Sequence, residues 1–254
     1  MSGDPLAATP KKPTIIFLGD SITTGQYVNQ VKEMIPGCTV HRYAKSGYTS
    51  EQVKREFLES AIAKNPTVMV IMVGANDIWQ GKTLESVVKN IGAMVSVANK
   101  KEIPVILVTI PPMRKYLEGE NPKEGFDEYV EKNIDRGMDI DSLVDGAERA
   151  EARTNTGMSR KKQETLKQAN SWIRKQSKAG RVEIVDVYSI LEDKDKKNAG
   201  QEGYQKQEYT TDGLHFNAKG HAALAKAIES AVRKVLTRTP AKKTQQQEPP
   251  RIVH

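Results

Sequence analysis

Ser21, Asp212 and His215 are the residues of this chain best suited to act together, because they combine a hydroxyl, a carboxylate and an imidazole. Ser21 follows the apolar run 14–18, while Asp212 and His215 stand three positions apart near the other end of the chain. A serine hydroxyl is a weak nucleophile until a neutral imidazole takes its proton and a carboxylate orients that imidazole. A histidine side chain is largely uncharged at neutral pH, as the role requires. The three residues therefore predict nucleophilic acyl transfer.

Each of these residues also has a simpler interpretation. A serine after Gly-Asp is common at the start of a helix, where its hydroxyl caps the first turn. The Asp-x-x-His pattern often reflects a helix cap followed by a surface histidine. His221 falls within the predicted last helix, and we interpret it as structural. Taken alone, Ser21 would be assigned as a helix cap.

Four short sequence blocks along the chain favour the nucleophile over the helix cap as the interpretation of Ser21. They read Gly19-Asp20-Ser21, Lys45-Ser46-Gly47, Gly74-Ala75-Asn76-Asp77 and Asp212-Gly213-Leu214-His215. In this order they resemble the blocks of the SGNH hydrolases, also called GDSL esterases, over residues 14–236. Ile22 replaces the usual leucine and Ala75 a frequent threonine, but neither is among the four residues for which the family is named. The resemblance implies that Ser21 is the nucleophile, His215 the general base and Asp212 its orienting carboxylate.

The resemblance also implies an oxyanion hole. The family supplies donors from the backbone N–H of the nucleophile, a glycine N–H and an asparagine side chain, which correspond here to Ser21, Gly47 and Asn76. Glycine has no Cβ, so Gly47 would let a ligand approach the backbone closely. A plain turn is the alternative explanation for Gly47 and Asn76. Losing one such donor typically raises the barrier by about 3 kcal/mol.

Trp79 and Met113 are assigned to substrate binding. Trp79 comes three residues after Asn76 and could stack on a sugar face, although packing in the core explains it equally well. Met113 ends a Pro-Pro-Met bend at 111–113, after a predicted strand. The histidines and the single cysteine, Cys38, show no zinc-ligand spacing, so we predict no metal and no cofactor.

Apolar runs predict five strands, at 14–18, 38–44, 67–73, 103–110 and 182–188. Helical patterns lie at 26–35, 50–61, 84–98, 161–178 and after His215, with Thr49 and Ser50 as caps of the second helix. Strands that alternate with helices predict an α/β protein with a parallel sheet covered on both faces. The resemblance implies a flavodoxin-like three-layer α/β/α sandwich, whose site lies at the carboxyl ends of the strands.

The predicted domain organisation is a flexible leader at 1–12, one hydrolase domain at 13–236 and a disordered tail at 237–254. Residues 115–159 hold twelve acidic and six basic side chains, and they form a predicted helical insertion after the fourth strand. The insertion is too long for an ordinary connection. A lid that selects substrate and a decorative helical excursion are both consistent with it.

The charge distribution separates this acidic insertion from a basic body, since the whole chain carries +7. The chain contains no recognisable nucleic-acid motif, which argues against a nucleic-acid partner. No apolar run approaches the ~20 residues of a membrane helix, so we expect no membrane insertion. The sequence also shows no secretory signal, which makes a cytoplasmic location the default and leaves virion association or another export route open. It gives no indication of oligomeric state.

The sequence thus predicts a serine esterase that hydrolyses a carboxylic ester through an acyl-enzyme. The low aromatic content of 6% favours a short acyl group, such as acetyl on a carbohydrate, in a small-molecule or glycan substrate. One alternative is a lysophospholipase or thioesterase acting on longer acyl chains. Another is a non-catalytic glycan-binding or assembly protein with the same fold, which the presence of all four motif residues disfavours.

Overall fold

The computed structural model describes residues 12–113, 160–178, 181–194, 205–210 and 213–238. Its strands are β1 (Thr14–Gly19), β2 (Thr39–Ala44), β3 (Val68–Met72), β4 (Val105–Val108) and β5 (Val182–Val185). They form one sheet in the order β2-β1-β3-β4-β5, and every neighbouring pair is parallel. The predicted five-stranded parallel sheet is confirmed.

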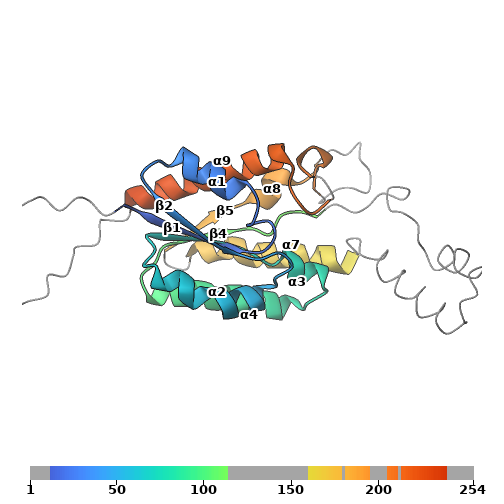
Figure 1. The fold of residues 1–254 in the computed structure, drawn as a ribbon. Coiled ribbons are helices and arrows are strands. Elements are labelled where there is room, and N and C mark those ends of the chain that lie inside the picture. The colour runs from blue at the N-terminus through green and yellow to red at the C-terminus, as the bar shows by residue number, and fades with distance from the viewer. Residues whose placement is uncertain (1–11, 114–159, 179–180, 195–204, 211–212, 239–254) are drawn as a thin grey trace, which may run out of the picture.

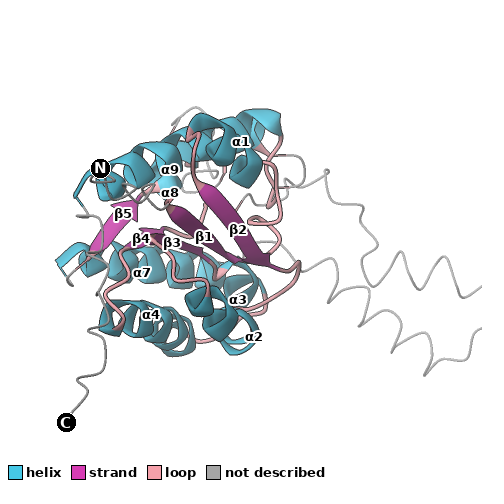
Figure 2. Ribbon diagram, turned by 60° about the vertical axis from the view of Figure 1, so that its left-hand side comes forward, coloured by secondary structure: helices cyan, strands magenta, loops and turns pink. Residues whose placement is uncertain are grey.

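Helices cover both faces of this sheet. They are α1 (Tyr27–Met34), α2 (Ser50–Ala63), α3 (Ala75–Trp79), α4 (Leu84–Lys100), α7 (Arg160–Lys175), α8 (Val187–Leu191) and α9 (Ala218–Arg238), with short 3-10 turns η1 (Gln176–Lys178) and η2 (Gln207–Tyr209). Helices α1, α8 and α9 lie on one face, and α2, α3, α4 and α7 lie on the other (Figures 1 and 2). The described residues therefore form the predicted three-layer α/β/α sandwich.

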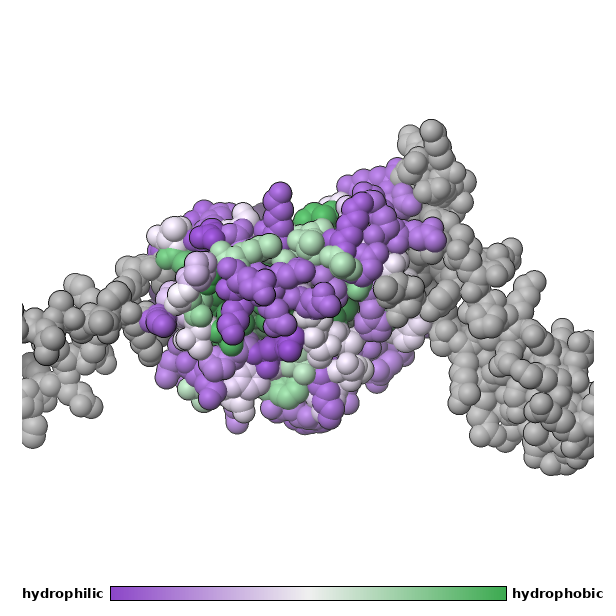
Figure 3. Space-filling model, turned by 45° about the horizontal axis from the view of Figure 1, so that its top comes forward, coloured by the Kyte–Doolittle hydropathy of each residue, from purple (hydrophilic) through white to green (hydrophobic). Residues whose placement is uncertain are grey.

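The hydrophobic core follows from this layering. All residues of β1, β3 and β4 are buried, because a central parallel strand meets a helix layer on each side. Strand β2, at the edge of the sheet, is only partly buried. The surface over α1 and α9 is mostly hydrophilic, with small separate apolar spots (Figure 3). None of the helices in the described ranges is long and apolar enough to cross a membrane.

The chain departs from the predicted elements after the fifth strand. The prediction extended this strand to Tyr188, but β5 ends at Val185. Asp186 then caps α8, since its side chain accepts a hydrogen bond from the backbone N–H of Ser189. Val187 and Tyr188 are therefore buried as part of a helix rather than a strand. The short helix α3 was not predicted, whereas α2 begins at Ser50 with Thr49 as its N-cap, as expected.

Residues 1–11 of the predicted leader, the predicted insertion at 115–159 and residues 239–254 of the predicted tail lie outside the described residues. Thr237 and Arg238, which the prediction assigned to the tail, belong to α9. Within the described part, the order of the strands defines where a ligand can bind. In a 2-1-3-4-5 sheet the winding direction reverses between β1 and β3, and ligands bind outside the carboxyl ends of the strands at such a reversal. The chain leaves β1, β2 and β3 at this edge through the segments that carry Ser21, Gly47 and Asn76.

Candidate active site

Ser21 lies in the turn that follows β1, and hydrogen bonds to the backbone of this turn hold it there. The Oδ1 atom of Asp20 accepts a hydrogen bond from the N–H of Ile22 at 3.0 Å. The Thr24 hydroxyl donates to the carbonyl of Ser21 at 2.6 Å, and the Thr24 N–H donates to the carbonyl of Asp20 at 3.1 Å. Helix α1 starts only at Tyr27, so Ser21 is not its N-cap. The simpler interpretation of this serine is therefore wrong.

His215 reaches Ser21 from the far end of the chain. Its Nε2 atom is 3.1 Å from the Ser21 Oγ atom, within the range expected for a nucleophile and its base. The Thr210 hydroxyl donates to the His215 carbonyl at 2.8 Å and accepts from the Gly213 N–H at 2.7 Å, which fixes the loop before α9. Asp212 lies outside the described residues.

His221, on α9, belongs to an aromatic cluster and not to this pair. Its ring stacks on Tyr27 at 6.3 Å between centroids and meets the edge of Phe216 at 5.7 Å. Burial lowers the pKa of His221, with a smaller contribution from nearby His215. The side chain therefore favours its neutral form and packs as an aromatic ring.

Gly47 lies in an exposed turn after β2. The backbone N–H of Tyr48 donates to the carbonyl of Lys45 at 3.3 Å, which closes the turn. Gly47 has φ of +79°, in the left-handed region that favours glycine, and an added Cβ would meet no atom within 4 Å. Backbone conformation, and not internal crowding, requires glycine here, and the Gly47 N–H donates to no group among the described residues.

Asn76 lies in the first turn of α3, directly after β3. Its Nδ2 atom donates to the carbonyl of Tyr48 at 3.0 Å, so the asparagine amide is tied to the turn that contains Gly47. An asparagine amide carries two hydrogens, and this contact uses one of them. The sequence proposes Asn76 and Gly47 as donors but does not indicate the Tyr48 carbonyl, because a backbone acceptor leaves no signal in the residue types.

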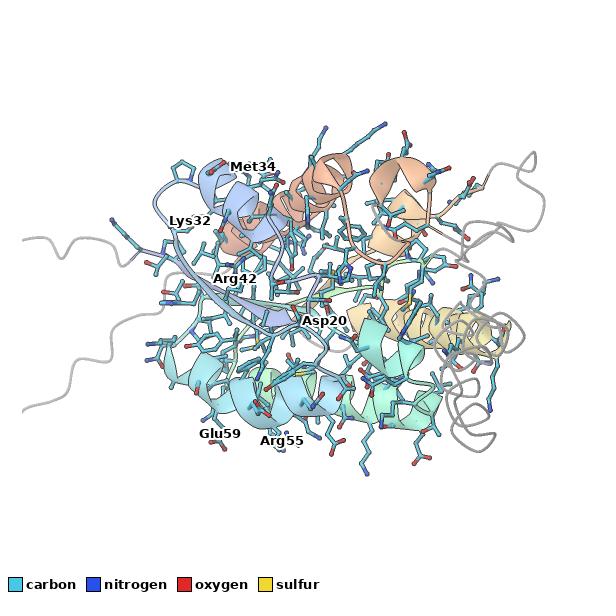
Figure 4. The ribbon with its side chains drawn as sticks, turned by 45° about the vertical axis from the view of Figure 1, so that its right-hand side comes forward. Asp20, Lys32, Met34, Arg42, Arg55 and Glu59 are labelled. Carbon is cyan, nitrogen blue, oxygen red and sulfur yellow. The ribbon has the colours of Figure 1, made fainter. Side chains whose placement is uncertain are left out.

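Asp20, next to Ser21, is an unusual buried acid at the end of the sheet (Figure 4). The residue is 1% exposed, and its Oδ2 atom has no hydrogen-bond partner within the described residues. Burial raises the pKa of Asp20 to about 7, against the opposing hydrogen bond from the Ile22 N–H. The nearby carboxylate of Asp77 adds to the increase. In the folded protein the Asp20 carboxyl group beside Ser21 therefore stays protonated at pH values well below 7 and loses its proton as the pH rises through that value.

The two residues assigned to substrate binding differ in their surroundings. Trp79 is partly buried at the end of α3, and the Lys162 ammonium of α7 lies 5.5 Å from the centre of its ring. Met113 is 1% exposed and belongs to the hydrophobic core. Among the described residues, no group of three or more His, Cys, Asp or Glu side chains could hold a metal ion.

The site as described brings a serine hydroxyl and an imidazole into contact at the reversal point of the sheet, with two potential N–H donors on the adjacent loops. The chain belongs to the GDSL-like lipase/acylhydrolase family, whose model matches residues 17–223. The resemblance seen in the four sequence blocks is thereby confirmed, and the protein is a hydrolase of this family. No curated protein sequence matches the chain.

Solved structures of other hydrolases share the fold. A GDSL-like lipase from Bacteroides thetaiotaomicron VPI-5482 is 21% identical, with a TM-score of 0.61 over 88% of this chain and 89% of that one. An acetyl xylan esterase is 19% identical, with a TM-score of 0.59 over 86% and 99% of the two chains. A psychrotrophic esterase from Pseudoalteromonas sp., in a structure inhibited by monoethylphosphonate, is 17% identical, with a TM-score of 0.54 over 89% and 99%.

Proposed function

We propose that the protein is a serine esterase that hydrolyses a carboxylic ester through an acyl-enzyme on Ser21. The observation that carries this proposal is the 3.1 Å separation between Ser21 Oγ and His215 Nε2, in a chain of the GDSL-like lipase/acylhydrolase family. With its proton on Nδ1, the His215 ring can accept the Ser21 hydroxyl hydrogen at Nε2. Asp212, three residues earlier, is the proposed carboxylate that orients the ring.

In the first half of the reaction, Ser21 Oγ attacks the ester carbonyl carbon while His215 takes the hydroxyl proton. The carbonyl oxygen becomes an oxyanion, which the backbone N–H groups of Ser21 and Gly47 and the second amide hydrogen of Asn76 stabilise. The tetrahedral intermediate then collapses, the C–O bond to the alcohol breaks, and His215 returns the proton to the departing alkoxide. The product is an acyl ester of Ser21.

In the second half, water replaces the alcohol. His215 removes a proton from the attacking water, the same donors stabilise the second oxyanion, and the proton returns to Ser21 Oγ as the carboxylic acid leaves. No metal or cofactor takes part in these steps. The residues of the site thus return to their starting protonation states after each turnover.

The proposed substrate carries a short acyl group, such as acetyl, on a carbohydrate. The fold is similar to that of an acetyl xylan esterase, and the partly exposed Trp79 offers an aromatic face near Asn76. Sugar rings stack on such faces through their apolar C–H groups. A panel of p-nitrophenyl esters from acetate to palmitate tests this assignment: we expect acetate to give the highest kcat/KM. Preference for octanoate or palmitate would indicate a lysophospholipase or thioesterase instead.

Covalent labelling tests the nucleophile independently of the substrate. A fluorophosphonate reacts with an activated serine and leaves a stable phosphonyl ester, which peptide mass spectrometry locates. We expect one adduct, on Ser21, in the wild-type protein and none in Ser21→Ala. Labelling of a different serine, or no labelling of a protein that hydrolyses p-nitrophenyl acetate, would contradict the proposed mechanism.

A further inference from the structure

We propose that Asp77 is a positioning residue for ester hydrolysis. Through its hydrogen bonds with Ser50, it fixes the position of the loop that carries Asn76 relative to the loop that carries Gly47. The inference rests on the proposed function, because Asp77 would act through the two oxyanion donors assigned there. Asp77 follows Asn76 directly, and Ser50 comes three residues after Gly47. A contact between Asp77 and Ser50 therefore joins the two loops immediately beside the groups that must converge on the substrate.

The Asp77 carboxylate accepts two hydrogen bonds from Ser50. Its Oδ2 atom accepts a hydrogen bond from the Ser50 backbone N–H at 2.7 Å, and its Oδ1 atom accepts one from the Ser50 hydroxyl at 2.6 Å. Ser50 is fully buried and Asp77 is 1% exposed. Hydrogen bonds to an ionised acceptor are shorter and stronger than neutral ones, and two parallel contacts also fix orientation. The pair thus forms a directional clamp in a region closed to water.

A second contact joins the same two loops, with donor and acceptor exchanged between them. Asn76 donates its Nδ2 hydrogen to the Tyr48 carbonyl at 3.0 Å, while the neighbouring Asp77 accepts from Ser50. The hydrogen bond from Asn76 to Tyr48 sets the rotation of the asparagine amide, and the hydrogen bonds from Ser50 to Asp77 set the distance between the loops. Together they determine the direction in which the remaining amide hydrogen of Asn76 points.

The capping box at the start of helix α2 does not bind the N–H of Ser50, which donates to Asp77 instead. Thr49 and Gln52 form a complete capping box there, in which the Thr49 backbone N–H donates to Gln52 Oε1 at 2.9 Å. Burial raises the pKa of Asp77, and the two hydrogen bonds from Ser50 oppose that increase. A buried carboxylate is costly unless its partners are well placed. Asp77 therefore satisfies the buried Ser50 N–H and at the same time joins the two loops that carry the proposed oxyanion donors.

The chain contains a second carboxylate that holds a serine in this way and can serve as a control. Asp186 also accepts from the N–H and the hydroxyl of one serine, Ser189, at 3.3 and 2.8 Å. It follows β5, which β3 and β4 separate from β1 in the sheet. Asp186 also accepts from the Thr109 hydroxyl at 3.2 Å and from the Arg174 guanidinium at 2.9 and 3.0 Å. Asp186→Ala therefore removes more hydrogen bonds than Asp77→Ala does, at a distance from the proposed site. If Asp77 had a merely structural role, Asp77→Ala would lower kcat no more than Asp186→Ala does.

The experiment compares kcat and KM for p-nitrophenyl acetate, and the rate of fluorophosphonate labelling, in the wild type, Asp77→Ala, Asp77→Asn, Ser50→Ala, Asp186→Ala and Ser21→Ala. Misplaced oxyanion donors weaken transition-state binding, so we expect Asp77→Ala to lower kcat by about 10- to 100-fold. KM should change by less than about threefold, since those donors act mainly in the transition state. The labelling rate should fall by the same factor as kcat.

Asp77→Asn should recover most of the lost kcat, because its amide can accept from the Ser50 N–H and donate to the Ser50 hydroxyl. Ser50→Ala keeps the N–H contact and should lower kcat by a few-fold, and it decides the question if Asp77→Ala does not fold. Asp186→Ala should keep wild-type kcat. The positioning role is overturned if Asp77→Ala and Ser50→Ala turn over at the rate of Asp186→Ala while Ser21→Ala is inactive. Wild-type turnover in Ser21→Ala would instead overturn the proposed function itself.

Discussion

The Nε2 atom of His215 lies 3.1 Å from the Oγ atom of Ser21, although 194 positions separate the two residues in the chain. The turn after β1 holds Ser21, and the loop that leads into α9 holds His215. Helix α9 packs beside α1 on one face of the sheet, which returns the end of the chain to its beginning (Figure 1). The contact therefore depends on the whole sandwich and cannot form in either half of the chain alone.

The buried acid beside this contact should make stability depend on pH. Burial raises the pKa of Asp20 to about 7 from 3.8, so the folded protein keeps a proton that the unfolded chain releases near pH 4. Between these values the folded state binds more protons, and its free energy of unfolding falls as the pH rises. The full effect above pH 7 is on the order of 4 kcal/mol.

Asp20→Asn removes this titration while its amide oxygen can still accept from the Ile22 N–H. We expect the variant to gain stability relative to the wild type as the pH rises from 5 to 8. Urea unfolding of both proteins at the two pH values measures the difference, in which other titrating groups largely cancel. A difference that is the same at pH 5 and pH 8 would show that Asp20 is ionised throughout.

Gly47→Ala should lower both stability and activity. Its φ of +79° is unfavourable for alanine, which should cost about 1 kcal/mol of stability. Gly37 is a matched control. It has φ of +87°, and an added Cβ would again meet no atom within 4 Å. It precedes β2 and so lies at the opposite end of that strand from Gly47. We expect both variants to lose similar stability in thermal unfolding, but only Gly47→Ala to lose kcat, by about tenfold or more. Equal kcat values in the two variants would remove Gly47 from the oxyanion hole.

Asn170 should be one of the residues on which stability depends most. It is fully buried on α7, and its amide both accepts from the Ile110 N–H and donates to the Ile110 carbonyl, each at 2.8 Å. Asn170→Ala leaves two buried backbone groups without partners, which should lower the free energy of unfolding by about 2 to 5 kcal/mol. Gln168→Ala, on the exposed side of the same helix, should change it by less than about 0.5 kcal/mol. Urea titrations of both variants would contradict this account if their midpoints were alike.

The central strands could be predicted from the sequence because burial on both faces demands an uninterrupted apolar run. Strands β1 and β3 show this directly, since every residue in them is buried. The prediction failed beyond β5 because Val187 and Tyr188 are buried in a helix, and burial alone does not distinguish a short helix from a strand. Helix α3 was missed for the same reason, as Ala75 and Ile78 continue the apolar run of β3.

The candidate site shows a similar division. Ser21, Gly47, Asn76 and His215 stand in short blocks whose residue types indicate their chemistry, and the structure places Ser21 and His215 in contact. The contacts between the loops depend on the Tyr48 carbonyl and on Ser50, and neither has a distinctive sequence signal. A backbone acceptor can come from any residue, and a serine at a helix start is common, so only the folded arrangement reveals them.

The kcat of Ser21→Ala with p-nitrophenyl acetate decides whether Ser21 is the nucleophile of ester hydrolysis. Ser177, an exposed serine in η1, provides the control variant Ser177→Ala, which should keep wild-type turnover. We expect pure, folded Ser21→Ala to lose activity by about 10⁴-fold or more, because no other group in the proposed mechanism can form the acyl-enzyme. Turnover by Ser21→Ala at the rate of Ser177→Ala would show that ester hydrolysis does not proceed through Ser21.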